Sequence, residues 1–248
     1  MNDDFYIGWQ DRAAPALARF GRRRALAIAL LGAAVSAGLA ATQGPFAASR
    51  FEFGVERSFE GRVEFVPYPT LVVDRPGEAA GTSRWLLTAF GKFGADDALE
   101  GLDGQRVRFD GSLIDRDGVT MVELAADSVE DLGDGGERAG RGAAVAMTLA
   151  GEIVDSKCYL GVMKPGNLKT HRACAARCIS GGVPPVLLVR NGDGTARYLL
   201  LVGPDGEAVN DRVLDVVAER VEIRGELEEI GGLELLRFDP AEIRRLDG

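Results

Sequence analysis

The stretch RVRFDGSLIDRDGVTMVELAADSVEDL, residues 106–132, returns as RVEIRGELEEIGGLELLRFDPAEIRRL, residues 220–246, without a gap and at a constant offset of 114 residues. Upstream, the segments 60–63 and 84–87 have counterparts at 150–153 and 197–200. Equivalent positions carry similar residues, such as Val107 and Val221, Phe109 and Ile223, and Gly111 and Gly225. The chain beyond residue 46 therefore contains two copies of one module.

Each copy has the pattern of short, half-buried strands. From Arg106 to Gly111, apolar or small residues alternate with charged ones, as in a strand with one buried face. The pairs 117–118 (Asp-Gly) and 231–232 (Gly-Gly) are hairpin-turn signals, and each copy is short for the seven strands of an immunoglobulin-like sandwich. We therefore predict a mainly β fold. Its two tandem five-stranded, OB-like barrels span residues 47–132 and 145–248, and the glycine-rich stretch 133–144 is a linker.

The first 46 residues have a different composition. Residues 1–24 contain five arginines, and residues 25–41 carry no charged side chain. About 20 mostly apolar residues cross a bilayer, so residues 25–46 are predicted to be a transmembrane anchor after a basic cytoplasmic tail, residues 1–24. The expected location is the inner (cytoplasmic) membrane, single-pass, with the bulk of the chain periplasmic or extracellular. A cleaved signal peptide is the alternative, because small residues at 37–41 suit a cleavage site.

Charge and motifs limit the function. A net charge of −9 argues against a nucleic-acid partner, which would need a basic face. There is no glycine-rich phosphate loop after a strand, no G-x-S-x-G and no H-E-x-x-H motif, so an enzyme of those classes has no support. The expected partners are the lipid bilayer, through residues 25–46, and a membrane-bound protein complex.

The reactive residues of the chain gather in DSKCYLGVMKPGNLKTHRACAARCISGGVP, residues 155–184. This stretch holds all three cysteines, the only histidine and three of the four lysines. The matched glycine and aromatic residue are 24 residues apart in the first copy (Gly61 and Trp85) and 47 residues apart in the second (Gly151 and Tyr198). We therefore predict that residues 157–184, here called the Cys/His segment, are an insertion after the first strand of the second barrel. Loops on a rigid barrel commonly carry function.

The spacing in this segment predicts a metal site. His171, Cys174 and Cys178 stand at i, i+3 and i+7 of a short helix, so their side chains share one face, and Cys158 is the natural fourth ligand. Three thiolates and an imidazole form a soft ligand set that suits copper(I) or zinc. Further candidates are Met163 as an additional soft ligand, and Lys157, Lys169 and Arg172 as positive charges that favour the thiolates.

Two other interpretations of the cysteines remain open. A disulfide from Cys158 to Cys174 or Cys178 would attach the segment to the barrel and stabilise the fold by about 3 kcal/mol. In that case the protein is a non-catalytic accessory subunit of a membrane complex. A thiolate activated by the neighbouring lysines and arginines would instead exchange with the disulfide of a partner. Copper is favoured over zinc because exported free thiols tend to oxidise unless they are protected.

The overall plan of a basic tail, one span and an exported OB-like barrel resembles the membrane-anchored haem chaperone of cytochrome c maturation. The His-x3-Tyr attachment pattern of that family is missing, since Ala175 stands four places after His171. The pair Cys174-x3-Cys178 with a histidine is similar to the copper-delivery proteins of cytochrome oxidase assembly, which place it in a thioredoxin-like fold. These resemblances imply a respiratory partner and a copper ion.

Overall fold

The structure is a computed structural model that describes residues 12–42, 49–74, 81–138, 140–192 and 195–246. The chain forms two compact units, residues 1–46 and residues 47–248, and each is described by itself. Residues 1–11 of the predicted tail and residues 43–46 of the predicted anchor lie outside the described residues.

The first unit contains one long helix, α1 (Pro15–Thr42), which begins ten residues before the predicted anchor. Proline suits the first turn of a helix, where its missing N–H has no partner to lose. Residues 15–41 form a helix that is long and apolar enough to cross a membrane. At 1.5 Å per residue these 27 residues extend about 40 Å, more than the roughly 30 Å of a hydrocarbon core.

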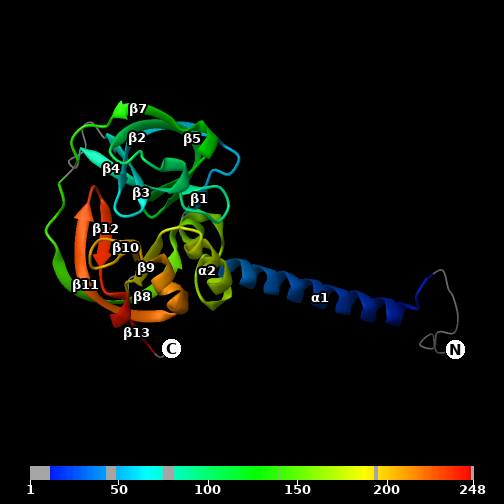
Figure 1. The fold of residues 1–248 in the computed structure, drawn as a ribbon. Helices are drawn as coiled ribbons and strands as arrows, with labels where there is room; N and C mark the ends of the chain where they lie inside the picture. The colour runs from blue at the N-terminus through cyan, green and yellow to red at the C-terminus, as the bar shows by residue number, and fades with distance from the viewer. Residues whose placement is uncertain (1–11, 43–48, 75–80, 139, 193–194, 247–248) are drawn as a thin grey trace. The chain divides into compact units, whose positions relative to one another are not determined.

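The second unit begins with the first barrel (Figure 1). Its five strands are β2 (Arg57–Phe65), β3 (Pro69–Asp74), β4 (Thr82–Ala89), β5 (Gln105–Arg116) and β6 (Val119–Leu124). They close in the order β2-β3-β4-β6-β5-β2, and only the β4–β6 pair is parallel among the pairs of this ring. Strands β1 (Ser49–Phe51) and β7 (Glu130–Asp134) add to β5 outside the ring. Short helices η1 (Asp97–Leu99) and η2 (Ala126–Ser128) complete the barrel.

The second barrel repeats this topology. Its strands are β8 (Val145–Asp155), β9 (Pro185–Arg190), β10 (Ala196–Val202), β11 (Arg220–Ile230) and β12 (Leu233–Arg237), closing in the order β8-β9-β10-β12-β11-β8 with β10 and β12 parallel. Short helices α3 (Asn210–Val213), η5 (Leu214–Val216) and η6 (Pro240–Glu242) and the two-residue strand β13 (Arg244–Arg245) complete it. The prediction of a mainly β fold with two tandem five-stranded barrels is confirmed.

Matched glycines explain why the two copies share a sequence pattern. A Cβ at Gly111 would lie 2.6 Å from the carbonyl oxygen of Glu123, and one at Gly225 would lie 2.3 Å from that of Arg237. In both barrels this glycine lies where the fourth strand changes partners from the first strand to the fifth. Only glycine permits the backbone to approach so closely.

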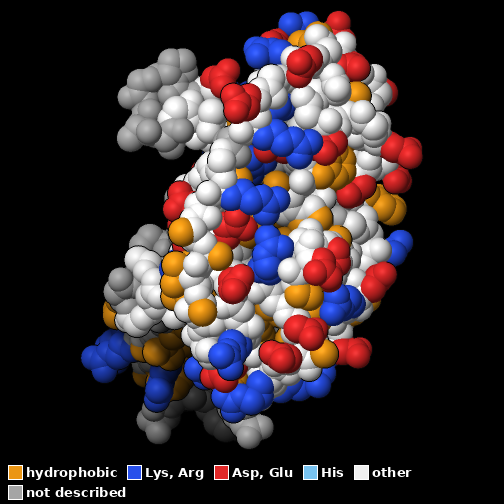
Figure 2. All heavy atoms as spheres, turned by 60° about the vertical axis from the view of Figure 1, so that its left-hand side comes forward, with side chains coloured by type: hydrophobic (Ala, Val, Ile, Leu, Met, Phe, Trp, Pro, Cys, Tyr) orange, Lys and Arg blue, Asp and Glu red, His pale blue; other side chains and the backbone are white. Residues whose placement is uncertain are grey.

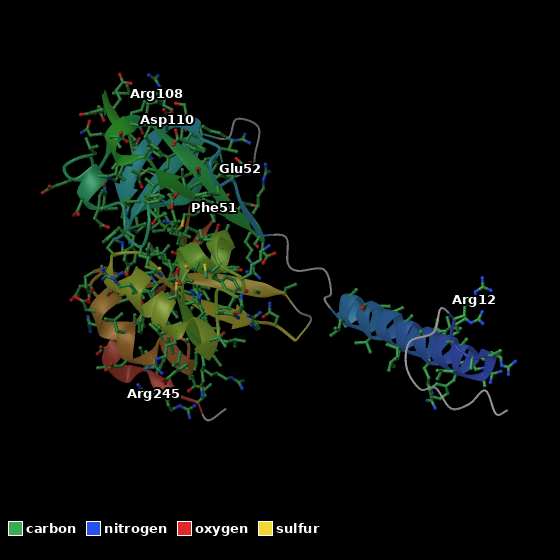
Figure 3. The ribbon with its side chains drawn as sticks, turned by 90° about the vertical axis from the view of Figure 1, so that its right-hand side faces the viewer. Arg12, Phe51, Glu52, Arg108, Asp110 and Arg245 are labelled. Atoms are coloured by element: carbon green, nitrogen blue, oxygen red, sulfur yellow. The ribbon has the colours of Figure 1, made fainter. Side chains whose placement is uncertain are left out.

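The connection after the first strand differs between the barrels. Residues 66–68 join β2 to β3, whereas residues 156–184 separate β8 from β9 and form η3 (Cys158–Val162), η4 (Lys169–His171) and α2 (Arg172–Ser180). Helix η3 contacts β1 and β5 of the first barrel (Figure 3, in which Phe51 marks β1). The Cys/His segment therefore lies at the junction of the two barrels.

Apolar and polar contacts join the barrels. One buried cluster contains Tyr68 and Met121 from the first barrel together with Tyr159 and Leu200 from the second. Lys157, only 2% exposed, extends from the second barrel into the first, where it pairs with Glu123 and donates to two backbone carbonyls. Elsewhere, Figure 2 shows acidic and basic side chains interspersed over the face it presents, with no large patch of one sign.

Candidate metal centre

Four adjoining elements bring the candidate ligands together. Asp155 ends β8, and Cys158 begins the π-helix η3. The backbone N–H of Cys158 donates to Oδ1 of Asp155 over 2.7 Å, which holds the first turn of η3 against the strand end. His171 is the last residue of η4, and α2, which follows directly, presents Cys174 and Cys178 from successive turns.

The three sulfur atoms converge at the spacing of a metal site. Sγ of Cys158 lies 3.9 Å from Sγ of Cys174 and 3.8 Å from Sγ of Cys178, and all three cysteines are free. Tetrahedral thiolates at metal–sulfur distances of about 2.3 Å would be about 3.8 Å apart. The observed separations exceed the roughly 2.05 Å of a disulfide bond. Two triads that share Cys158, namely Cys158 with His171 and Cys174 and Cys158 with Asp155 and Cys178, are each close enough together to hold an ion.

A buried carboxylate orients the histidine. Nε2 of His171 lies 3.0 Å from Oδ2 of Asp155, and both residues are buried. A ring nitrogen of His171 is within 4.8 Å of the sulfur atoms of Cys158 and Cys174. A histidine that binds a metal usually donates its other ring N–H to a carboxylate or carbonyl, which fixes the orientation of the ring. An oxygen of Asp155 also lies within 4.8 Å of the sulfur atoms of Cys158 and Cys178.

Lys92, from the first barrel, is a further charged partner of the thiols. Its Nζ lies 2.7 Å from Sγ of Cys174 and 3.8 Å from Sγ of Cys178. The loop that carries Lys92 docks on the end of α2, where the N–H of Gly94 donates to the carbonyl of Gly181 over 2.8 Å. The hydrogen bond to Cys174 raises the pKa of Lys92 although burial opposes it. The thiol cluster is therefore built by both barrels.

The pKa values of Cys158 and Cys178 shift in opposite directions. The hydrogen bond with Cys178 raises the pKa of Cys158, and burial and the nearby Asp155 carboxylate raise it further. The same bond lowers the pKa of Cys178, with help from Lys92, although burial opposes the shift. The hydrogen bond between them thus favours the thiol form of Cys158 and the thiolate form of Cys178.

The remaining predicted residues have other contacts. Met163 follows η3 and is 44% exposed. Lys157 pairs with Glu123 rather than with sulfur, and Arg172 donates to Glu219. Lys169 is exposed in η4. Of the four lysines, the one that contacts the thiols is thus Lys92, the only lysine outside the Cys/His segment, and no motif in the sequence pointed to it.

The function has to be argued from the geometry of the site, because comparison with protein families and with curated proteins gives no match. The chain matches no model of a known protein family, and a search of curated proteins finds no significant match. The cluster of Cys158, His171, Cys174, Cys178 and Asp155 can hold a metal ion.

Proposed function

We propose that this protein is a membrane-anchored, exported metal-binding protein. It holds one soft metal ion, Cu(I), through Cys158, His171, Cys174 and Cys178, for delivery to or retention in a membrane-bound respiratory partner. The observation that carries this proposal is the convergence of three free thiols with separations of 3.8 and 3.9 Å from Cys158. The ring nitrogen of a carboxylate-bound histidine within 4.8 Å supports the same site.

The ligand set and its exposure support a soft ion that is transferred. Thiolate and imidazole bind Cu(I) and Zn²⁺ well and bind hard cations poorly. Cys158, Cys178 and His171 are buried, whereas Cys174 is half-buried. A partner's thiol would thus reach the ion from the side of Cys174. Export favours Cu(I), because a bound metal protects thiols that would otherwise oxidise outside the cytoplasm.

The anchor is the second part of the proposal. Helix α1 is long and apolar enough to cross a bilayer, and arginines precede its apolar part. Arginine-rich flanks tend to remain cytoplasmic, which places the barrels on the opposite side of the membrane. Tethering would keep the bound ion near membrane proteins and would raise its effective concentration for such a partner.

The experiment is a Cu(I) titration of the reduced full-length protein in detergent, in competition with a coloured Cu(I) chelator. Wild type is expected to bind one ion per chain. Cys158→Ser and Cys178→Ser are each expected to weaken binding at least tenfold, since each removes a thiolate ligand. Met163→Leu is the matched control, because Met163 is exposed and lies outside the sulfur cluster.

Two results would overturn the proposal. One is wild-type protein that takes up no Cu(I) while its three thiols are reduced. The other is cysteine variants that bind as tightly as wild type, which would place the ion elsewhere. A single disulfide with one free thiol in protein isolated from cells would favour the accessory-subunit interpretation instead.

A further inference from the structure

The side chain of Lys92 reaches the thiol cluster from the first barrel, and close packing of the backbone fixes its position. A Cβ on Gly181 would lie 2.0 Å from the carbonyl oxygen of Lys92, and a Cβ on Gly94 would lie 2.5 Å from that of Gly182. Both close backbone contacts between the β4–η1 loop and the end of α2 therefore require glycine. They hold Nζ of Lys92 at 2.7 Å from Sγ of Cys174.

This lysine would lie close to any ion that the thiols bind. Its nitrogen is 2.7 Å from Cys174, and metal–thiolate bonds are about 2.3 Å long, so the ammonium is no more than about 5 Å from an ion on Cys174. Coulomb energy is proportional to the charge of the ion. The repulsion felt by a divalent cation is therefore about twice that felt by a monovalent cation at the same place.

The other charged groups of the site act in the opposite direction. The thiolates and the buried Asp155 carboxylate attract a divalent ion more strongly than a monovalent one. Lys157 and Arg172 have their charges paired with Glu123 and Glu219. Among the described residues, Lys92 is the lysine or arginine with a hydrogen bond to the cysteine sulfur atoms.

We infer that Lys92 is a specificity-determining residue that shifts the thiol site from divalent toward monovalent soft ions, that is, from Zn²⁺ toward Cu(I). This inference rests on the proposed function, because it concerns the same metal site. A ratio of affinities isolates the effect. Both affinities are measured on the same folded protein, so contributions of Lys92 to folding cancel in that ratio.

The test measures Cu(I) and Zn²⁺ affinities of wild type, Lys92→Met and Lys92→Arg by competition with coloured chelators of each ion. Lys92→Met is expected to lower the ratio of Cu(I) to Zn²⁺ affinity at least tenfold, which corresponds to about 1.4 kcal/mol. Lys92→Arg keeps the charge and is expected to keep the wild-type preference. Lys164→Met is the matched control, because it removes an exposed lysine of the Cys/His segment.

The outcomes separate this inference from the function on which it rests. If wild type binds neither ion, the metal site and the role of Lys92 both fail. If both ions bind and Lys92→Met leaves the ratio unchanged, the metal site stands and the role of Lys92 is refuted. An equal loss of preference in Lys92→Arg and Lys92→Met would also refute it, since charge would then not be the cause.

Discussion

Replacing Lys157 by methionine is predicted to destabilise the junction of the barrels by about 3–5 kcal/mol. Lys157 is 2% exposed, pairs with Glu123 and donates to the carbonyls of Ala89 and Gly91, each over 2.7 Å. Methionine fills the same space without a charge, so the Glu123 side chain, only 12% exposed, would be left without its cation. Removing one partner of a buried pair costs this much because the remaining charge is not solvated.

For a protein whose stability is about 5–15 kcal/mol, a loss of about 3–5 kcal/mol is a large fraction of the total.

The assay is urea unfolding of the full-length protein in detergent at pH 7. The double variant Lys157→Met/Glu123→Gln is expected to recover at least about 2 kcal/mol of the loss, because it leaves no unpaired charge. Lys164→Met removes an exposed lysine and is expected to change stability by less than about 0.5 kcal/mol. A cost below about 1 kcal/mol for the single variant, or a double variant no better than the single one, would refute this account of the junction.

Three further predictions concern the site and the first barrel. Asp155→Asn is expected to weaken metal binding about 10–100-fold, because His171 loses the carboxylate that orients it; unchanged affinity in a chelator competition would contradict this. Gly181→Ala is expected to lower the free energy of unfolding by about 1–3 kcal/mol, because its Cβ would meet a backbone oxygen of the first barrel at 2.0 Å. Gly192→Ala, whose Cβ would have nothing within 4 Å, should leave the urea unfolding curve unchanged. Burial raises the pKa of Glu64, but its arginine partners lower it by more, so its net pKa lies below the ordinary value of a glutamate. A lowered pKa in the folded state adds stability above pH 4.5 that is lost as the pH falls, so Glu64→Gln should flatten the acid limb of stability against pH; an unaltered limb would count against it.

The sequence predicted those parts of the fold that depend on local pattern. The alternation of apolar and charged residues and the hairpin turns recur in both copies. The equivalent glycines at 111 and 225 face equivalent carbonyl groups because the same topology is built twice. Helical spacing predicted that His171 and Cys174 lie on one face, and the structure brings both of them close to Cys158. The helix itself begins only at Arg172, so His171 joins the cluster from the preceding turn, where Asp155 holds it.

The packing of one barrel on the other left no pattern in the sequence. Lys92 and Cys174 are 82 residues apart, and neither periodicity nor turn chemistry relates them. Lys157 was predicted to be a positive charge beside the thiols, but its four-carbon chain extends to Glu123. Which carboxylate or sulfur a lysine contacts depends on how the two barrels dock. Complementary surfaces decide this docking, and local propensity does not.

The most direct test of the account is the metal and thiol content of the full-length protein isolated from membranes without air. The account predicts about one copper ion per chain and three cysteines that react with an alkylating reagent only after a strong chelator removes the ion. Protein that carries no metal and contains one disulfide and one reactive thiol would contradict it.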